Sequence, residues 1–502
     1  MKEHFHSSLI NRIFLFSVFI FLVAGTQAFA KSKSPDKLID EDLAQFEEIL
    51  TQGYVAYDKA VKENGFDVKK TIKKIKSTYK KYYAYRKRQK KDYKIVNGID
   101  VNALGFAMAD VTRPALNIKD MHLAGSLDGA VQYMCRGQYP FYVNVWFEKA
   151  DEVFVVVKSD IEEIKIGDIY TDEIENMRPW ITGGKLLYRF GVISEYWGDA
   201  KISINGKEII VKTNAYDFIP IEKKFFDCIE TDETLYISLS TCHLDENNEA
   251  HHKELLEAFD LILEKAAQAK NKKNVIFDLR SNGGGFQSYP QKILSAIFSG
   301  KSKVADEYTE FDSVIRLSEF GTLSLYSPYI ARNQLMDALA NRSYDVNNIA
   351  RLRTDYDDMM KNPSRFYGGY ENPSLSYLPM MENPAFTGKL IILMDKGTAS
   401  AAEKGITFSY LTKNQNIILV GENSWGCIDY GGVLYETLKN SGIQIQFPIC
   451  DYTNHAALKQ NPKWHGDSLG FMPDFWADKS NLMDTLIYLT GDKEIVKKLE
   501  RK

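Results

Sequence analysis

Four segments of the chain carry residue types that together could act on a carbonyl group. Residues 278–285 read D-L-R-S-N-G-G-G, and a glycine run lets the backbone approach a ligand closely with its N–H groups free. Residues 395–403 read D-K-G-T-A-S-A-A-E and contain Ser400. Residues 420–427 read V-G-E-N-S-W-G-C, and residues 466–474 read G-D-S-L-G-F-M-P-D. A serine hydroxyl beside free backbone donors suits nucleophilic attack with a stabilised oxyanion.

The same segments also have ordinary structural explanations. The glycine run could be a plain connection between a strand and a helix. Ser400 could be a helix N-cap, which is a common use of serine at that position. The run is not G-x-x-x-x-G-K, so a cradle for nucleotide phosphates is not favoured.

The elements around these segments predict an α/β layer structure with helices packed on a sheet. Strands are expected at the short apolar runs 234–239, 274–279, 390–394 and 417–420. Apolar residues at helical spacing predict a helix around residues 255–263, and a second helix begins at or near Ser400. Ser400 therefore lies between a strand end and a helix start, in the field of the helix N-terminus.

The order D-L-R-x-N-G-G-G, G-T-A-S-A-A-E, V-G-E-x-x-x-G and G-x-x-P-D resembles the tail-specific, or C-terminal processing, serine peptidases. Their relatives include the tricorn-type peptidases and the retinoid-binding protein of the interphotoreceptor space. The resemblance covers roughly residues 230–480 and implies a crotonase/Clp-like layered α/β fold. It also implies that Ser400 is the nucleophile and that the backbone N–H groups of Gly284 and Ala401 form the oxyanion hole.

The general base is where the sequence departs from this family. The processing peptidases place a lysine after G-E-x-x-x-G, and this position holds Cys427. The tricorn-type relatives use a histidine on the first strand, and the corresponding position holds Ser238. Their acidic partner, six residues before the proline of G-x-x-P-D, corresponds to Asp467.

Three residues are candidates for a substitute base. His243 follows the strand 234–239 at the expected active-site edge, Lys404 lies one helical turn after Ser400, and His465 precedes Asp467 by two residues. For each of the three, a solvated surface role is the favoured interpretation. Cys427 is expected to be a small buried apolar residue rather than a thiolate.

The rest of the chain divides into further regions. We expect a signal peptide at 1–30, an N-terminal helical region at 31–135, a PDZ-like β module at 136–222, and a catalytic domain at 223–502 with an inserted subdomain at about 300–386. The module is indicated by I-x-x-G-D followed by I-N-G, by a short helix expected at 172–178 before Pro179, and by a hairpin turn at Asn205-Gly206. PDZ-like modules bind peptide ends as an added strand.

A basic segment from Lys69 to Lys94 contains thirteen Lys or Arg residues. It could bind an anionic surface, but a long helix with a solvated basic face is the favoured interpretation. The whole chain has 63 Lys+Arg against 67 Asp+Glu, a net charge of −4, which argues against general nucleic-acid binding.

Residues 1–30 indicate export. The segment combines Lys2 and Arg12 with an apolar run of about a dozen residues and ends A-F-A, as a cleavable signal does. The run is short for a bilayer span, and we expect no stable membrane span after cleavage. Five widely spaced cysteines show no C-x-x-C or Cys/His ligand spacing, so neither a metal nor a cofactor is expected.

The sequence thus predicts an exported serine peptidase, periplasmic or extracellular, that acts on a peptide or protein through a Ser400 acyl-enzyme. The alternative is a non-catalytic member of the same fold that binds peptides or hydrophobic ligands after losing its base. An acyl-CoA enzyme is less favoured, because export separates it from coenzyme A. The oligomeric state and the natural substrate are not indicated.

Overall fold

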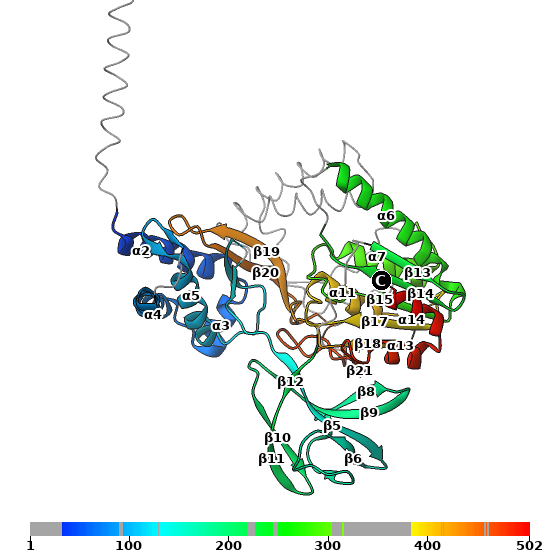
Figure 1. Cartoon of the computed structure of the whole chain (residues 1–502). Helices are drawn as coiled ribbons and strands as arrows, with labels where there is room; N and C mark the ends of the chain where they lie inside the picture. Colours follow the sequence, from blue (N-terminus) through cyan, green and yellow to red (C-terminus); the bar gives the residue numbers. More distant parts are fainter. Residues whose placement is uncertain are drawn as a thin grey trace, which may run out of the picture.

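The computed structural model describes residues 33–89, 94–128, 130–217, 226–243, 249–303, 314–315, 383–412, 414, 416–455, 458 and 461–501. The predicted signal peptide and most of the predicted insertion at 300–386 lie outside these residues. The described chain has an N-terminal helical lobe, a β module and an α/β domain. Figure 1 shows these three parts next to one another.

The α/β domain is built on a six-stranded sheet in the order β13-β14-β15-β17-β18-β21. Its strands are β13 (Phe226–Glu230), β14 (Thr234–Leu239), β15 (Asn274–Asp278), β17 (Lys389–Met394), β18 (Ile417–Gly421) and β21 (Phe475–Trp476). All neighbours from β14 to β21 pair in parallel, and only β13 runs antiparallel. The four strands predicted from the apolar runs are confirmed.

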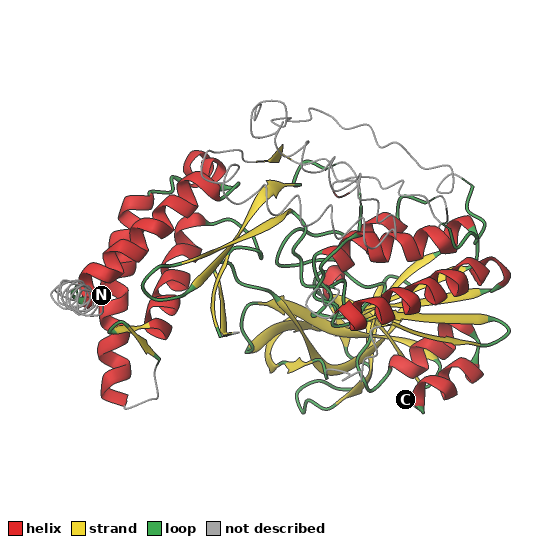
Figure 2. Cartoon of the chain, turned by 90° about the horizontal axis from the view of Figure 1, so that it is seen from above, coloured by secondary structure: helices red, strands yellow, loops and turns green. Residues whose placement is uncertain are grey.

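Helices cover both faces of this sheet, as Figure 2 shows from above. Residues such as Ile237 and Phe277 pack with α6 (Glu249–Ala267), α7 (Ser288–Ser299) and α11 (Ala401–Ser409). The alternate residues Tyr236 and Ile276 pack with α13 (Leu482–Thr490) and α14 (Lys493–Glu500). Strands buried on both faces explain the continuous apolar runs, and the predicted layered α/β class is confirmed.

The N-terminal lobe is a helical cluster capped by short strands. Its elements are α2 (Pro35–Glu48), the π-helical turn η1 (Ile49–Gly53), α3 (Tyr57–Asn64), α4 (Val68–Gln89), β1 (Ile95–Val96), β2 (Ile99–Asp100), α5 (Val101–Leu116), β3 (Ala124–Leu127) and β4 (Ala130–Tyr133). The predicted helical region at 31–135 is thus helical with four short strands.

A hairpin from the C-terminal part of the chain completes this lobe. β19 (Tyr430–Thr437) pairs with β20 (Gln444–Asp451), and β20 pairs antiparallel with β3, with Gln444 opposite Ser126. β16 (Val314–Ile315) pairs with the other end of β20. The carboxylate of Asp42 on α2 accepts the backbone N–H groups of Asn440 and Ser441 at the hairpin turn. Residues near 120 are therefore held close to residues near 430–470.

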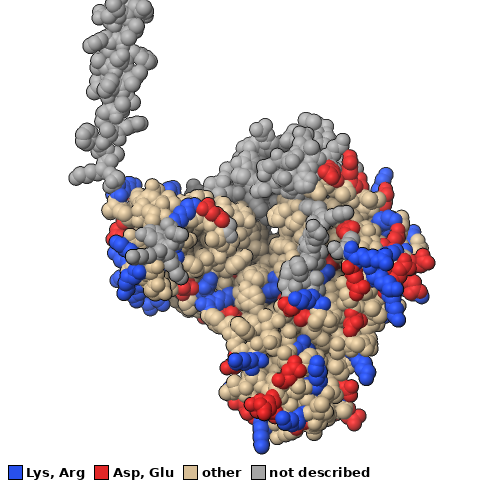
Figure 3. Space-filling model, in the orientation of Figure 1, with Lys and Arg blue, Asp and Glu red and all other residues tan. Residues whose placement is uncertain are grey.

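The basic segment forms the long helix α4. Its buried side chains are Val68, Thr71, Ile75 and Tyr79, whereas its lysines face outward, and Figure 3 shows basic side chains over this lobe. Lys76 and Lys80 form ion pairs with Asp40 and Asp36 of α2. These features match the favoured interpretation of a solvated basic face.

Residues 139–215 form an eight-stranded antiparallel sheet in the order β11-β10-β7-β6-β5-β9-β8, with β12 beside β5. The strands are β5 (Tyr139–Ala150), β6 (Val153–Ser159), β7 (Ile169–Tyr170), β8 (Met177–Thr182), β9 (Lys185–Ser194), β10 (Asp199–Ile204), β11 (Lys207–Lys212) and β12 (Asn214–Ala215). The Asn205-Gly206 turn is confirmed, with φ values of 51° and 74°. A PDZ-like function for this module stays a prediction.

The short helix expected at 172–178 is wrong. Only a 3₁₀ turn forms at Ile174–Asn176, and Met177 begins β8. Pro179 lies inside β8, which is the edge strand of its sheet and can tolerate a residue that donates no hydrogen bond. β8 also contacts the α/β domain, where the Asn481 side-chain amide donates to the carbonyl of Ile181 at 3.1 Å.

Candidate active site

Ser400 occupies a strained position between β17 and α11. Its φ and ψ are 51° and −114°, a conformation that non-glycine residues rarely adopt. The loop before it is fixed, because the N–H of Ala399 donates to the carbonyl of Asn282 at 2.9 Å. Strain of this kind persists only where the surroundings impose it, and it concentrates at functional sites. The structure thus presents Ser400, at the carboxyl edge of the parallel strands, as the sequence predicts.

Gly284 lies directly against Ser400. A Cβ atom added to Gly284 would sit 2.7 Å from Cβ of Ser400 and 3.0 Å from the backbone nitrogen of Ala401. The predicted nucleophile and both predicted oxyanion donors are therefore brought together. The N–H of Ala401, in the first turn of α11, has no intrahelical acceptor. The N–H of Gly284, however, donates to Oδ1 of Asn282 at 3.0 Å, so this donor is engaged inside the protein.

Glu403 links Ser400 to the segment 424–427 through hydrogen bonds. Its carboxylate is fully buried and accepts the backbone N–H groups of Ser400 and Cys427 at 2.9 Å each and that of Gly426 at 2.8 Å. The Ser424 hydroxyl also donates to it, at 2.5 Å. Burial raises the pKa of Glu403, while these four donors lower it. Glu403 thus positions the segment 424–427 beside Ser400.

Cys427 lies beside Ser400 as a neutral thiol. It is 4% exposed and packs with Met121, Cys135 and Ala399. Burial raises the pKa of its thiol well above the usual range, and the charges of Glu403 and Asp467 add to this. A thiol held neutral is no general base, in agreement with the small buried residue that the sequence predicts.

The predicted candidate His243 lies on the rim of the glycine turn. Its side chain is exposed, and its ring packs edge-on against Phe286 with 6.2 Å between ring centroids. His465 is also exposed, with a pKa lowered by partial burial and by the neighbouring Arg178 and Lys463.

Two lysines that lie close to Ser400 in the sequence have perturbed amino groups. Lys404 lies over the ring of Tyr452 at 4.1 Å, and burial lowers its pKa to about 8. Lys396, which the sequence analysis missed, donates to the carbonyls of Ser424, Trp425 and Ser468 at 3.0–3.3 Å. Burial lowers its pKa to about 8 as well. Three carbonyl acceptors hold Lys396 as a positioned ammonium group.

The predicted acid Asp467 lies in a buried cluster with Asp120 and His122. One nitrogen or oxygen atom from each of the three residues lies within 4.8 Å of the other two. Burial raises the pKa of Asp467 well above its usual range and that of Asp120 to about 7. Burial, together with the charge of Lys404, lowers the pKa of His122 to about 4. The imidazole is therefore neutral at pH 7.

A sequence neighbour of this cluster packs with a sequence neighbour of Ser400. Met121, next to His122, packs in one apolar group with Ala399, next to Ser400, and with Cys427. The sequence analysis missed His122 because Asp120-Met121-His122 lies outside the segments that carry the family resemblance. A D-x-H triplet directly before the β module is the signal that could have revealed it.

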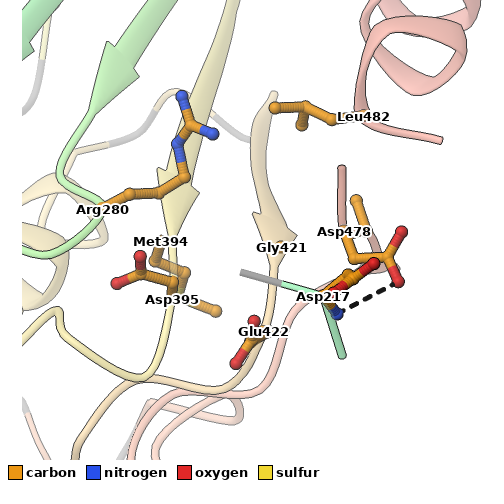
Figure 4. A pocket seen from close by; sticks show the side chains of 9 residues that line it. Asp217, Arg280, Met394, Asp395, Gly421, Glu422, Asp478 and Leu482 are labelled. Atoms are coloured by element: carbon orange, nitrogen blue, oxygen red, sulfur yellow. Dashed lines mark hydrogen bonds between the residues drawn. The ribbon is translucent and has the colours of Figure 1, made fainter. Parts of the chain in front are cut away.

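A small pocket, with a cavity volume of about 10 Å³, opens at the same sheet edge (Figure 4). Asp395, Glu422 and Asp478, which follow the ends of β17, β18 and β21, contribute carboxyl groups. Burial raises the pKa of Glu422 to about 7, and the charges of Asp395 and Asp478 add to the shift. Arg280, also in the lining, forms a bidentate ion pair with Asp278 at 2.5 and 2.9 Å. The Asp and Arg of the D-L-R motif thus bind each other.

A strained serine beside a glycine turn, on the carboxyl edge of a parallel sheet, is the arrangement expected of a serine hydrolase. Residues 234–474 match the model of peptidase family S41. This segment is therefore similar to that peptidase family, as the order of its motifs predicted. No curated protein matches the sequence.

Two solved structures illustrate the similarity of this chain to known folds. Mature CPAF is 13% identical with a TM-score of 0.42, and the match covers 93% of this chain and 97% of that one. The photosystem II D1 C-terminal processing protease is 11% identical with a TM-score of 0.32, and the match covers 92% of this chain and 98% of that one.

Proposed function

We propose that this chain is an exported serine peptidase that hydrolyses peptide bonds through an acyl-enzyme on Ser400, with His122 as general base and Asp467 as the residue that orients it. The observation that carries this proposal is the buried pair of His122 and Asp467, together with the packing of Met121 against Cys427 and against Ala399, which is next to the strained Ser400 in the chain. A neutral histidine next to a carboxylate is the pair that activates a serine in many hydrolases.

The chemistry follows from these positions. Ser400 Oγ attacks the peptide carbonyl carbon while its proton passes to the neutral imidazole of His122. The N–H of Ala401 donates a hydrogen bond to the oxyanion. The N–H of Gly284 donates a second one after its hydrogen bond to Oδ1 of Asn282 breaks. The amine leaves with the proton from His122, and water then releases the acyl group by the same route in reverse. Asp467 stabilises the imidazolium that forms in both halves.

One observation favours a second candidate, a binding protein of the same fold. The N–H of Gly284 is engaged with Asn282, and the family's lysine position holds the neutral thiol of Cys427. A chain with these features could hold a peptide without cleaving it.

Export rests on residues 1–30, which combine two basic residues, an apolar run and A-F-A. Among the described residues, no helix has the length and apolar character needed to cross a bilayer. We expect a mature N-terminus near Lys31, and intact-mass measurement of the exported protein tests it. Retention of Met1 to Ala30 would contradict cleavage.

Labelling with a serine-directed fluorophosphonate tests the mechanism. Wild type should be labelled, and Ser400→Ala should not. His122→Gln should slow labelling by about 10²- to 10⁴-fold, the usual contribution of a general base. His243→Gln is the matched control and should label at the wild-type rate.

The outcomes separate the candidates. Wild type that takes no label while it binds peptide supports the binding protein. Fast labelling of His122→Gln together with slow labelling of His243→Gln assigns the base to His243. Hydrolysis of an unfolded protein that survives Ser400→Ala would refute the serine mechanism.

A further inference from the structure

Three buried polar atoms in the cluster of Asp120, His122 and Asp467 have no hydrogen-bond partner. They are Oδ2 of Asp120, Nδ1 of His122 and Oδ2 of Asp467. The three residues are 1%, 7% and 1% exposed. Buried polar atoms are almost always paired, because an unpaired one costs about 1–3 kcal/mol. Three such atoms at one place form a candidate site for a ligand.

The other atoms of these side chains are fixed as in metal sites. Oδ1 of Asp120 accepts the backbone N–H of His122 at 2.7 Å. Oδ1 of Asp467 accepts the backbone N–H groups of Ile428 and Asp429 at 2.8 Å each. The imidazole of His122 also faces the backbone carbonyl of Tyr430. Second contacts of this kind orient ligand side chains toward a metal ion.

The charges of the cluster balance around a divalent cation. Two carboxylates and a neutral imidazole carry a charge of −2, and a divalent ion brings the buried group to zero. Without a cation the two buried carboxylates repel each other and resist ionisation. The Tyr54 hydroxyl, which is also buried, lies beside Asp120 and forms no hydrogen bond of ordinary geometry. It adds an oxygen to the same space.

The dimensions and ligand types select the metal. Two atoms that each lie about 2.1 Å from one zinc ion are at most about 4.2 Å apart. The cluster, whose atoms lie within 4.8 Å of one another, therefore needs a contraction of at most about half an ångström. A histidine nitrogen among the ligands favours zinc and its first-row neighbours over magnesium and calcium.

We propose that Asp120, His122 and Asp467 bind one divalent transition-metal ion of the zinc class, and that this ion holds the peptidase in a resting state. The proposed resting state rests on the proposed function, because it requires His122 to be the general base for Ser400. A metal ion bound to His122 would prevent that role. Bound metal occupies an imidazole nitrogen and keeps His122 turned toward the two carboxylates. Its removal releases the base.

Metal binding is tested on the mature chain after dialysis against a chelator. Calorimetric titration with Zn²⁺ alone should show one ion per chain, and Co²⁺ should give visible absorption bands. His122→Gln and Asp120→Asn should each weaken binding at least about 10-fold. Ser400→Ala should bind Zn²⁺ as tightly as wild type, and His243→Gln is the matched histidine control. Circular dichroism establishes that each variant is folded.

Fluorophosphonate labelling tests the proposed resting state. One equivalent of Zn²⁺ should slow labelling of Ser400 at least about 10-fold, and a chelator should restore it. Zn²⁺ binding that Ser400→Ala retains, with no labelling under any condition, supports the metal site and refutes the peptidase. Absence of stoichiometric binding, or binding that His122→Gln and Asp120→Asn leave unchanged while both are folded, overturns the metal site. Labelling that bound Zn²⁺ does not slow overturns the resting state.

Discussion

Ser400 and Cys427 share one hydrogen-bond acceptor, because the backbone N–H groups of both residues donate to Oε2 of Glu403 at 2.9 Å. The glutamate that ends the motif G-T-A-S-A-A-E therefore acts as a positioning residue. It joins Ser400 to the segment 424–427.

Glu403→Ala should lower the free energy of unfolding by about 3–5 kcal/mol. The substitution leaves buried N–H groups of Ser400, Gly426 and Cys427 without an acceptor. Urea unfolding measures the change. Glu257→Ala, at an exposed site on α6, is the matched control and should change it by less than about 0.5 kcal/mol. Similar losses in the two variants would contradict the positioning role.

Gly284→Ala should abolish fluorophosphonate labelling, because the new methyl group would lie 2.7 Å from Cβ of Ser400 and 2.9 Å from the carbonyl of Ala399. Gly184→Ala is the matched control. Gly184 also has a positive φ, of 73°, but open space around its added Cβ. It should cost about 1–2 kcal/mol of stability and leave labelling intact. Labelling of Gly284→Ala at the wild-type rate would show that the two backbones separate in solution.

Cys427→Lys should not restore a fast peptidase. The cysteine is buried among Met121, Cys135 and Ala399, and the longer side chain would overpack this space at a cost of about 1–3 kcal/mol. Thermal unfolding and the labelling rate of Cys427→Lys, compared with Cys427→Ala, measure both effects. A faster rate at unchanged stability would show that the site still accommodates the family's lysine.

Glu422→Gln should stabilise the protein at pH 8 and leave it unchanged near pH 4. Burial raises the pKa of Glu422 from 4.5 to about 7, so the native state holds a proton that the unfolded chain has released. Wild-type stability from this group therefore falls as the pH rises from 4.5 to about 7, and the loss is complete above that. The variant lacks this loss and should gain about 1–3 kcal/mol at pH 8. Urea unfolding across pH 4–8 measures it, and a gain that is equal at every pH would assign the effect to packing instead.

The sequence by itself determined the parallel sheet and the position of Ser400 at its edge. The strands around residues 234–239, 274–279, 390–394 and 417–420 follow from local apolar runs, which depend only on neighbouring residues. The position of Ser400 follows because one strand and one helix meet there. A helix was predicted just before Pro179, but the proline lies in an edge strand. Tertiary pairing determines which strands lie at an edge, so local sequence does not reveal it.

Only the tertiary structure decided which residues surround Ser400. His122 and Asp467 meet because β3 pairs with β20, and no local pattern records a pairing between strands more than 300 residues apart. The predicted base, His243, was chosen by its position after a strand, but the fold leaves its ring exposed. No contiguous ligand spacing predicts the proposed metal site, because Asp120 and Asp467 are far apart in the sequence. Side-chain chemistry can be read along a sequence, but burial and proximity arise only when distant segments pack.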